Sequence, residues 1–108
     1  MFGIKPKSFQ MILSALSEFR EIEKAGIYGS RALGTYKPGS DIDLVLYGNK
    51  ITEDTILKLK VKLEHELPIP YYFDLIHYQT ISNLNMKQHI DEQSKVFYSP
   101  STANQIFR

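Results

Sequence analysis

Two aspartates stand at the start of a strongly predicted β-strand, and this feature constrains the fold more than any other. The strand covers Ile42–Tyr47, which is rich in apolar and β-branched residues, and a Gly-Asn pair ends it. Because successive strand side chains point to opposite faces, Asp41 and Asp43 share one face while Ile42 and Leu44 share the other. The strand therefore has a carboxylate face and an apolar face.

The remaining sequence alternates between helical and strand patterns. The expected helices cover about 6–20, 31–33, 52–67 and 81–90. The expected strands cover about 25–28, 42–47 and 71–77, with a further short edge strand at 96–98. In the last helix, Leu84 and Ile90 are expected to face inward, and 99–108 should form a loop or a frayed helical turn. This alternation predicts an α+β fold, a short sheet flanked by helices in the order αβαβαβα.

Composition narrows the class of protein. The 108 residues fit one domain covering 1–108, and 43% hydrophobic with 23% charged residues is typical of a globular protein. Thirteen Lys and Arg balance twelve Asp and Glu, so we expect no nucleic acid as a direct partner. The absence of cysteine excludes disulfides, zinc–thiolate sites and thiol catalysis. No apolar run approaches about 20 residues and the start lacks a signal peptide, so we expect no membrane span and a cytoplasmic location.

A Gly-Ser turn upstream favours a binding site over a solvated strand end as the interpretation of the aspartate pair. Taken alone, an Asp-x-Asp is common on solvated strand ends, and a Gly-Ser turn is usually only a turn. Gly29 and Ser30, however, follow a strand and open a helix, where backbone N–H groups attract phosphate oxygens. Neighbouring carboxylates repel each other unless a cation lies between them, and magnesium binds carboxylate together with phosphate oxygens. Together the two features predict a site for a nucleoside triphosphate and a divalent metal.

A third carboxylate interrupts an apolar strand. Asp74 lies between Phe73 and Leu75, and burying an unpaired charge there would be costly. If its strand neighbours the strand of Asp43, three carboxylates converge, and bound metals could orient an α-phosphate and activate a hydroxyl. The alternative is an exposed aspartate on an edge strand.

These residues resemble the signature of the DNA polymerase β-like nucleotidyltransferase superfamily. The run from Gly29 to Leu44 reads Gly-Ser, ten residues and then Asp-x-Asp. The small size and the later Asp74 are similar to the minimal nucleotidyltransferase (MNT) group. The resemblance spans about residues 6–98 and implies a nucleotidyltransferase fold with a mixed sheet.

The resemblance also implies a role for each site residue. Gly29 and Ser30 would hold the β- and γ-phosphates of ATP. Two Mg²⁺ ions and the chemistry of transfer would depend on Asp41, Asp43 and Asp74. Arg31 would either contact a phosphate or pin the loop to one of the first two aspartates, and the sequence leaves both interpretations open.

A partner protein is implied as well. Some members of the MNT group are type VII antitoxins. They resemble enzymes that transfer AMP to a tyrosine of a cognate all-helical HEPN toxin encoded nearby. Others have been regarded as nucleotide-binding subunits of two-component transferases. Larger relatives carry a further acceptor-binding domain, for which this chain leaves no room. Three hypotheses therefore stay open: AMP transfer to a partner, a subunit of a two-component transferase, and an antitoxin that acts by binding alone.

Overall fold

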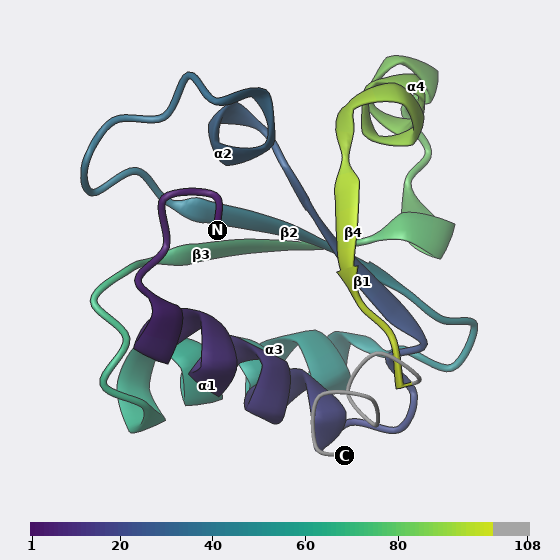
Figure 1. Cartoon of the computed structure of the whole chain (residues 1–108). Helices are drawn as coiled ribbons and strands as arrows, with labels where there is room; N and C mark the ends of the chain where they lie inside the picture. The colour runs from purple at the N-terminus through teal and green to yellow at the C-terminus, as the bar shows by residue number, and fades with distance from the viewer. Residues whose placement is uncertain (101–108) are drawn as a thin grey trace.

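The computed structural model describes residues 1–100, whose strands form a four-stranded mixed sheet in the order β3-β2-β1-β4 (Figure 1). The strands are β1 (Lys24–Tyr28), β2 (Ile42–Tyr47), β3 (Phe73–His77) and β4 (Lys95–Tyr98). The helices are α1 (Pro6–Ser17), α2 (Ser30–Leu33), α3 (Glu53–Val61) and α4 (Leu84–Gln93), with short helical turns at Lys62–Glu66 and Tyr78–Thr80. Strand β1 runs antiparallel to β2 and β4, while β2 and β3 are parallel. The predicted α+β class with a mixed sheet is confirmed.

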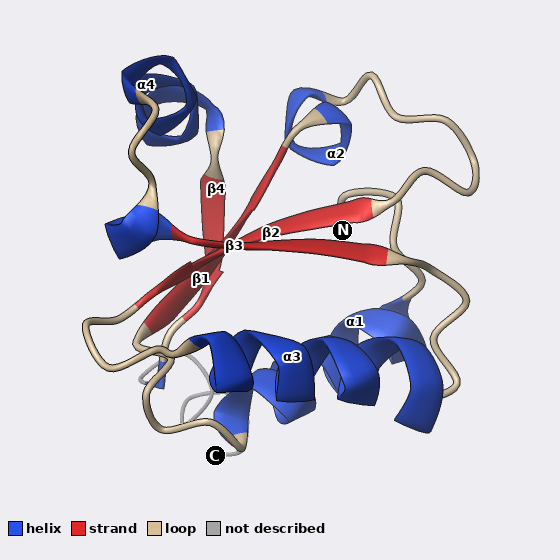
Figure 2. Ribbon diagram, turned by 180° about the vertical axis from the view of Figure 1, so that it is seen from behind, coloured by secondary structure: helices blue, strands red, loops and turns tan. Residues whose placement is uncertain are grey.

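The apolar face of the sheet is covered by α1 and α3, while α2 and α4 lie on its other side (Figure 2). Ile42, Leu44 and Leu46 of β2 are completely buried on the covered face, as the alternation along the strand predicts. Leu16 of α1 and Leu59 of α3 belong to the same buried cluster. Full burial of each such side chain contributes about 1.5–3 kcal/mol. The carboxylate face of β2 therefore points away from α1 and α3.

Helix α3 begins with a capping box and continues into a π-helical turn. The side chain of Thr52 accepts from the N–H of Thr55, and the N–H of Thr52 donates to Thr55 Oγ1, both at 3.2 Å. Threonine thus does here what Glu or Gln usually does at this position. The predicted start at Thr52 is confirmed. The π-helix over Lys62–Glu66 was not predicted, because an apolar stripe does not distinguish it from a continued α-helix.

The prediction that Leu84 faces inward is wrong. Asn83 caps α4 by accepting from the N–H of Met86 at 3.0 Å, so the helix starts three residues later than expected. Leu84 therefore falls in the first turn, where it is 80% exposed. Ile90 is completely buried and packs with Tyr28 and Val45 of the sheet, as its inward placement predicts.

Two further predictions concern the C-terminal part of the chain. The predicted edge strand is confirmed as β4, which pairs with β1. Residues 101–108 lie outside the described part, so the prediction of a loop or frayed turn for 99–108 falls largely there. Within residues 1–100, none of the helices has the length and apolarity that crossing a bilayer requires.

Leu59→Ala is expected to lower the free energy of unfolding by about 2–5 kcal/mol, because this completely buried side chain would leave a cavity. Leu57→Ala on the same helix is the matched control. Leu57 is 62% exposed, so its truncation should change the stability by less than about 0.5 kcal/mol. Urea denaturation followed by circular dichroism measures both values. Equal losses would contradict the packing of α3 described here.

Candidate active site

Tyr28, Asp43 and Asp74 form one row across three neighbouring strands. Tyr28 is opposite Asp43 in the antiparallel pair β1–β2, and Asp43 is opposite Asp74 in the parallel pair β2–β3. Directly opposed residues project from the same face of a sheet. Asp41 precedes β2, and its negative charge acts on Asp43. The predicted carboxylates are therefore gathered at the end of the sheet where β2 and β3 begin, with Asp43 and Asp74 on one face.

The Gly-Ser turn lies directly against the carboxylate of Asp43. Gly29 follows β1 with a φ of 71°, in the left-handed region. A Cβ atom at this position would collide with Oδ2 of Asp43, so both the backbone conformation and the close approach favour glycine. Helix α2 starts immediately afterwards at Ser30. The N–H groups of Ala32 and Leu33 donate to the carbonyl of Gly29, so the donors left at this helix start are those of Ser30 and Arg31. The predicted neighbourhood of turn and carboxylate is thus present.

The carboxylates influence one another electrostatically. Burial, and then the negative charges of Asp74 and Asp41, raise the pKa of Asp43, while the positive charge of Arg31 opposes this shift. A cation beside these groups would relieve the repulsion, and carboxylate oxygen is a ligand type that Mg²⁺ prefers. Among residues 1–100, however, no three acidic or histidine side chains are gathered closely enough to enclose a metal ion. The donors fit Mg²⁺ if substrate oxygens complete its coordination, as is usual for this ion.

Tyr28 is a site residue that the sequence analysis missed. Its hydroxyl donates to Oδ2 of Asp74 at 3.0 Å, and the side chain is only 6% exposed. Burial, followed by the negative charges of Asp74 and Asp43, raises the pKa of Tyr28 well above its ordinary value, so the phenol remains a hydrogen-bond donor. The sequence does place a tyrosine directly before the Gly-Ser turn. Assigning it to the site requires the register of β1 against β2, which the sequence does not show.

Arg31 is buried inside the loop that precedes β2. Its guanidinium donates to the backbone carbonyl of Ser40 at 2.7 Å from one nitrogen and 3.2 Å from another, and to the carbonyl of Phe2 at 3.0 Å. The rings of Tyr36 and Tyr71 lie 5.1 and 5.0 Å from the guanidinium carbon. This placement favours the pin over the phosphate contact. The pin reaches Asp41, but through its backbone carbonyl, which accepts from Nε of Arg31 at 3.4 Å, and not through its carboxylate.

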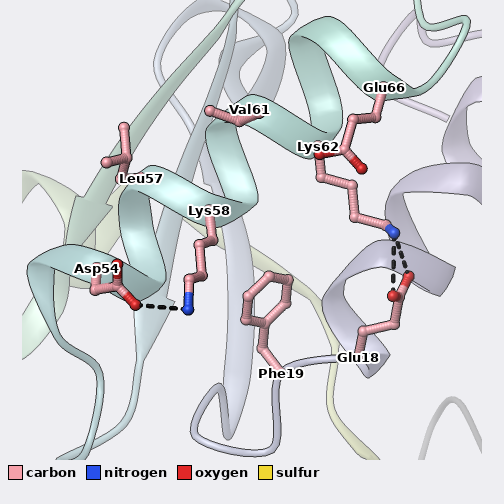
Figure 3. Close-up of a pocket in the computed structure, with 8 residues that line it drawn as sticks. All are labelled: Glu18, Phe19, Asp54, Leu57, Lys58, Val61, Lys62 and Glu66. Atoms are coloured by element: carbon pink, nitrogen blue, oxygen red, sulfur yellow. Dashed lines mark hydrogen bonds and ion pairs between the residues drawn. The ribbon is translucent and has the colours of Figure 1, made fainter.

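Two hollows in the described part of the chain lie away from the carboxylate row. A groove of about 460 Å³ runs between the end of α1 and α3 (Figure 3), and the ion pairs Lys58–Asp54 and Lys62–Glu18, both at 2.9 Å, lie on its walls. A second, more polar hollow of about 700 Å³ is lined by Tyr47, Gly48 and their neighbours at the opposite end of β2. Neither contains a member of the carboxylate row, so the row and the Gly-Ser turn define the candidate site.

Gly29→Ala is expected to destabilise the chain more than Gly34→Ala. Both glycines have positive φ, but Gly34 is in the αL region, where alanine costs about 1–2 kcal/mol, whereas Gly29 combines φ 71° with ψ −152°, a conformation that essentially only glycine adopts. Only at Gly29 would the new methyl group also collide with Asp43, whereas it would meet open space at Gly34. Urea denaturation of both variants measures the difference. Equal destabilisation would argue against the close contact between the turn and the carboxylate.

Asp43→Asn is expected to raise the melting temperature of the metal-free chain at neutral pH. Because the folded-state pKa of Asp43 is raised, the wild type loses stability as the pH rises through that pKa. The neutral amide removes this loss, so the gain should vanish below the ordinary pKa of 3.8. Thermal unfolding of both proteins in EDTA, from below pH 3.8 to neutral pH, measures the difference in melting temperature. Asp54→Asn, which breaks the exposed pair with Lys58, is the control and should give no gain.

Several solved structures share this fold. A toxin–antitoxin crystal structure with AMP-PNP matches with a TM-score of 0.69 and 20% identity, covering 91% of this chain and 78% of that chain. A tri-AMPylated Shewanella oneidensis HEPN toxin in complex with MNT antitoxin matches with a TM-score of 0.65 and 16% identity, covering 94% and 77%. A toxin–antitoxin MntA–HepT structure gives 0.65 and 16%, covering 95% and 80%. Identities this low show likeness of fold. No curated protein matches the sequence.

The family is shown by the sequence itself. A family model described as polymerase beta, nucleotidyltransferase matches residues 10–103. The match covers most of the chain and contains the Gly-Ser turn and all three aspartates of the candidate site. The chain therefore belongs to the polymerase β-type nucleotidyltransferase family.

Proposed function

We propose that the chain is a Mg²⁺-dependent enzyme that transfers AMP from ATP to a tyrosine hydroxyl of a small, all-helical HEPN-type partner, and so acts as an antitoxin in the cytoplasm. Membership of the nucleotidyltransferase family supports the class of reaction. Among the structures that share the fold, one was solved with AMP-PNP, and another contains a tri-AMPylated HEPN toxin with an MNT antitoxin. These neighbours support the choice of nucleotide, acceptor and partner.

The observation that carries the proposal is the pairing of Asp43 with Asp74 beside the turn at Gly29. In the proposed site, two Mg²⁺ ions would be held by Asp41, Asp43 and Asp74. Metal ions bound there would neutralise phosphate charge and make the acceptor hydroxyl more acidic. Like charges placed side by side without a cation are unfavourable, which is the reason to expect cation binding at this row.

The polypeptide itself would supply orientation and proton handling. The N–H groups at the start of α2, beginning at Ser30, would donate to the phosphate oxygens of ATP. The acceptor oxygen would attack the α-phosphorus as the bond to the β-phosphate oxygen breaks and pyrophosphate leaves. Asp74 is exposed on β3 and would accept the proton of the attacking hydroxyl. Arg31 would keep the loop before Asp41 in shape through its bonds to Ser40.

The decisive assay combines the purified chain, Mg²⁺, ATP labelled in the α-phosphate and the helical protein encoded beside it. The wild type is expected to attach AMP to a tyrosine of that protein, detected by autoradiography and mass spectrometry. Asp41→Asn combined with Asp43→Asn should lower the rate about 100-fold or more, because several kcal/mol of charge stabilisation in the transition state depends on the metals. Asp54→Asn is the matched control and should retain the wild-type rate.

Other outcomes would favour the other hypotheses. A folded wild-type chain that labels no acceptor would contradict the proposal. Labelling that appears only after co-purification with a second chain, which also binds the acceptor, would indicate a two-component transferase. A double aspartate variant that still neutralises the partner in cells would indicate an antitoxin that acts by binding alone.

A further inference from the structure

The hydroxyl of Tyr28 reaches Asp74 across an intervening strand. Strands β1 and β3 are not neighbours, because β2 lies between them in the sheet. Nevertheless, Tyr28 Oη donates to Oδ2 of Asp74 at 3.0 Å. Since Tyr28 is directly opposite Asp43, its ring has to pass the Asp43 position to make this bond.

This arrangement gives the two carboxylates different surroundings. Oδ2 of Asp74 is engaged by the phenol, and Oδ1 has no hydrogen-bond donor among residues 1–100. Oδ2 of Asp43 instead lies against Gly29. The phenol itself is buried and stays protonated, so it can act only as a donor to Asp74 under ordinary conditions. One oxygen of Asp74 is therefore engaged by the phenol, while the residue as a whole stays exposed.

Asp74 needs such a contact because β3 is an edge strand. Among residues 1–100 only β2 pairs with it, so the outer N–H and C=O groups of β3 have no strand partner there. At Phe73 these groups are held by α3 and its π-helical continuation: Glu64 Oε2 accepts from the N–H at 2.8 Å, and Lys60 Nζ donates to the carbonyl at 3.1 Å. The main chain next to Asp74 is thus anchored from outside, and the carboxylate is anchored from inside by Tyr28.

We propose that Tyr28 is a positioning residue whose hydroxyl, through its bond to Oδ2, holds the carboxylate of Asp74 in the orientation in which it would bind the divalent cation. The inference rests on the proposed function, because it takes Asp74 to be a ligand of Mg²⁺. Removing a hydrogen-bond partner of a metal ligand lowers metal affinity or activity about 10–100-fold. A ring that merely fills space gives a different expectation, since phenylalanine would fill the same space without loss.

The test compares Tyr28→Phe with Tyr98→Phe. Each substitution removes one phenol oxygen from a buried tyrosine of the same sheet, and Tyr98 belongs to the core cluster on the other face. Mn²⁺ binding to each protein in the presence of a non-hydrolysable ATP analogue, measured by water-proton relaxation, is expected to weaken about tenfold for Tyr28→Phe and to stay unchanged for Tyr98→Phe. The rate of AMP transfer should fall in parallel and recover partly at high metal concentration, whereas the KM for ATP at saturating metal should change little.

Several results would overturn the inference. With the ATP analogue present, unchanged Mn²⁺ affinity in a folded Tyr28→Phe variant would do so whatever its activity, and an absence of Mn²⁺ binding to the wild type would overturn both proposals. Weakened Mn²⁺ binding in Tyr28→Phe without AMP transfer by any variant would support the positioning role and contradict the proposed reaction. NMR of the wild type gives a check that needs no variant. The hydroxyl proton of Tyr28 should remain protected from exchange after Mg²⁺ is added, and its loss would overturn the inference.

Discussion

The parallel pairing of β2 with β3 is the constraint on which the rest of the structure depends. This register sets Asp43 opposite Asp74, and a slip of one residue would turn Asp74 toward the helices and bring an apolar side chain to the carboxylate face. Phe73 is buried in the core cluster and Leu75 packs against it. Apolar burial on one face of β2 and β3 therefore fixes the register that places Asp43 opposite Asp74 on the other face.

That alignment opposes folding in the absence of a cation. The raised pKa of Asp43 reflects burial and two like charges, which penalise its ionised form. The opposite face of the same strand offsets the penalty, because Ile42, Leu44 and Leu46 are completely buried and each contributes about 1.5–3 kcal/mol. A strand that carries unfavourable charges on one side and full apolar burial on the other is the arrangement expected where stability has been given up for binding.

The local features of this structure could be predicted from the sequence, and the non-local ones could not. Alternation within one strand gave β2 with its observed bounds, and Pro and Gly signals gave the loop before it. No local pattern states that β1 pairs with β2 so that Tyr28 faces Asp43, and the hydrogen bond to Asp74 follows only from that pairing. Leu84 was misplaced for a related reason, since the position of the cap decides which turn of α4 meets the sheet.

The edge position of Asp74 connects features that are distant in the sequence. An edge strand leaves the carboxylate accessible, but within residues 1–100 it provides a single neighbouring strand to hold it, and it risks pairing with other chains. Lys60 and Glu64, which also form an ion pair at 3.8 Å, occupy the outer polar groups of Phe73 and so block extension of the sheet beside the site. Glu64 lies in the π-helical turn, which gives that irregular segment a structural purpose. Access to Asp74 and order around it are thereby combined, because the helix anchors the strand from outside while Tyr28 anchors the exposed carboxylate.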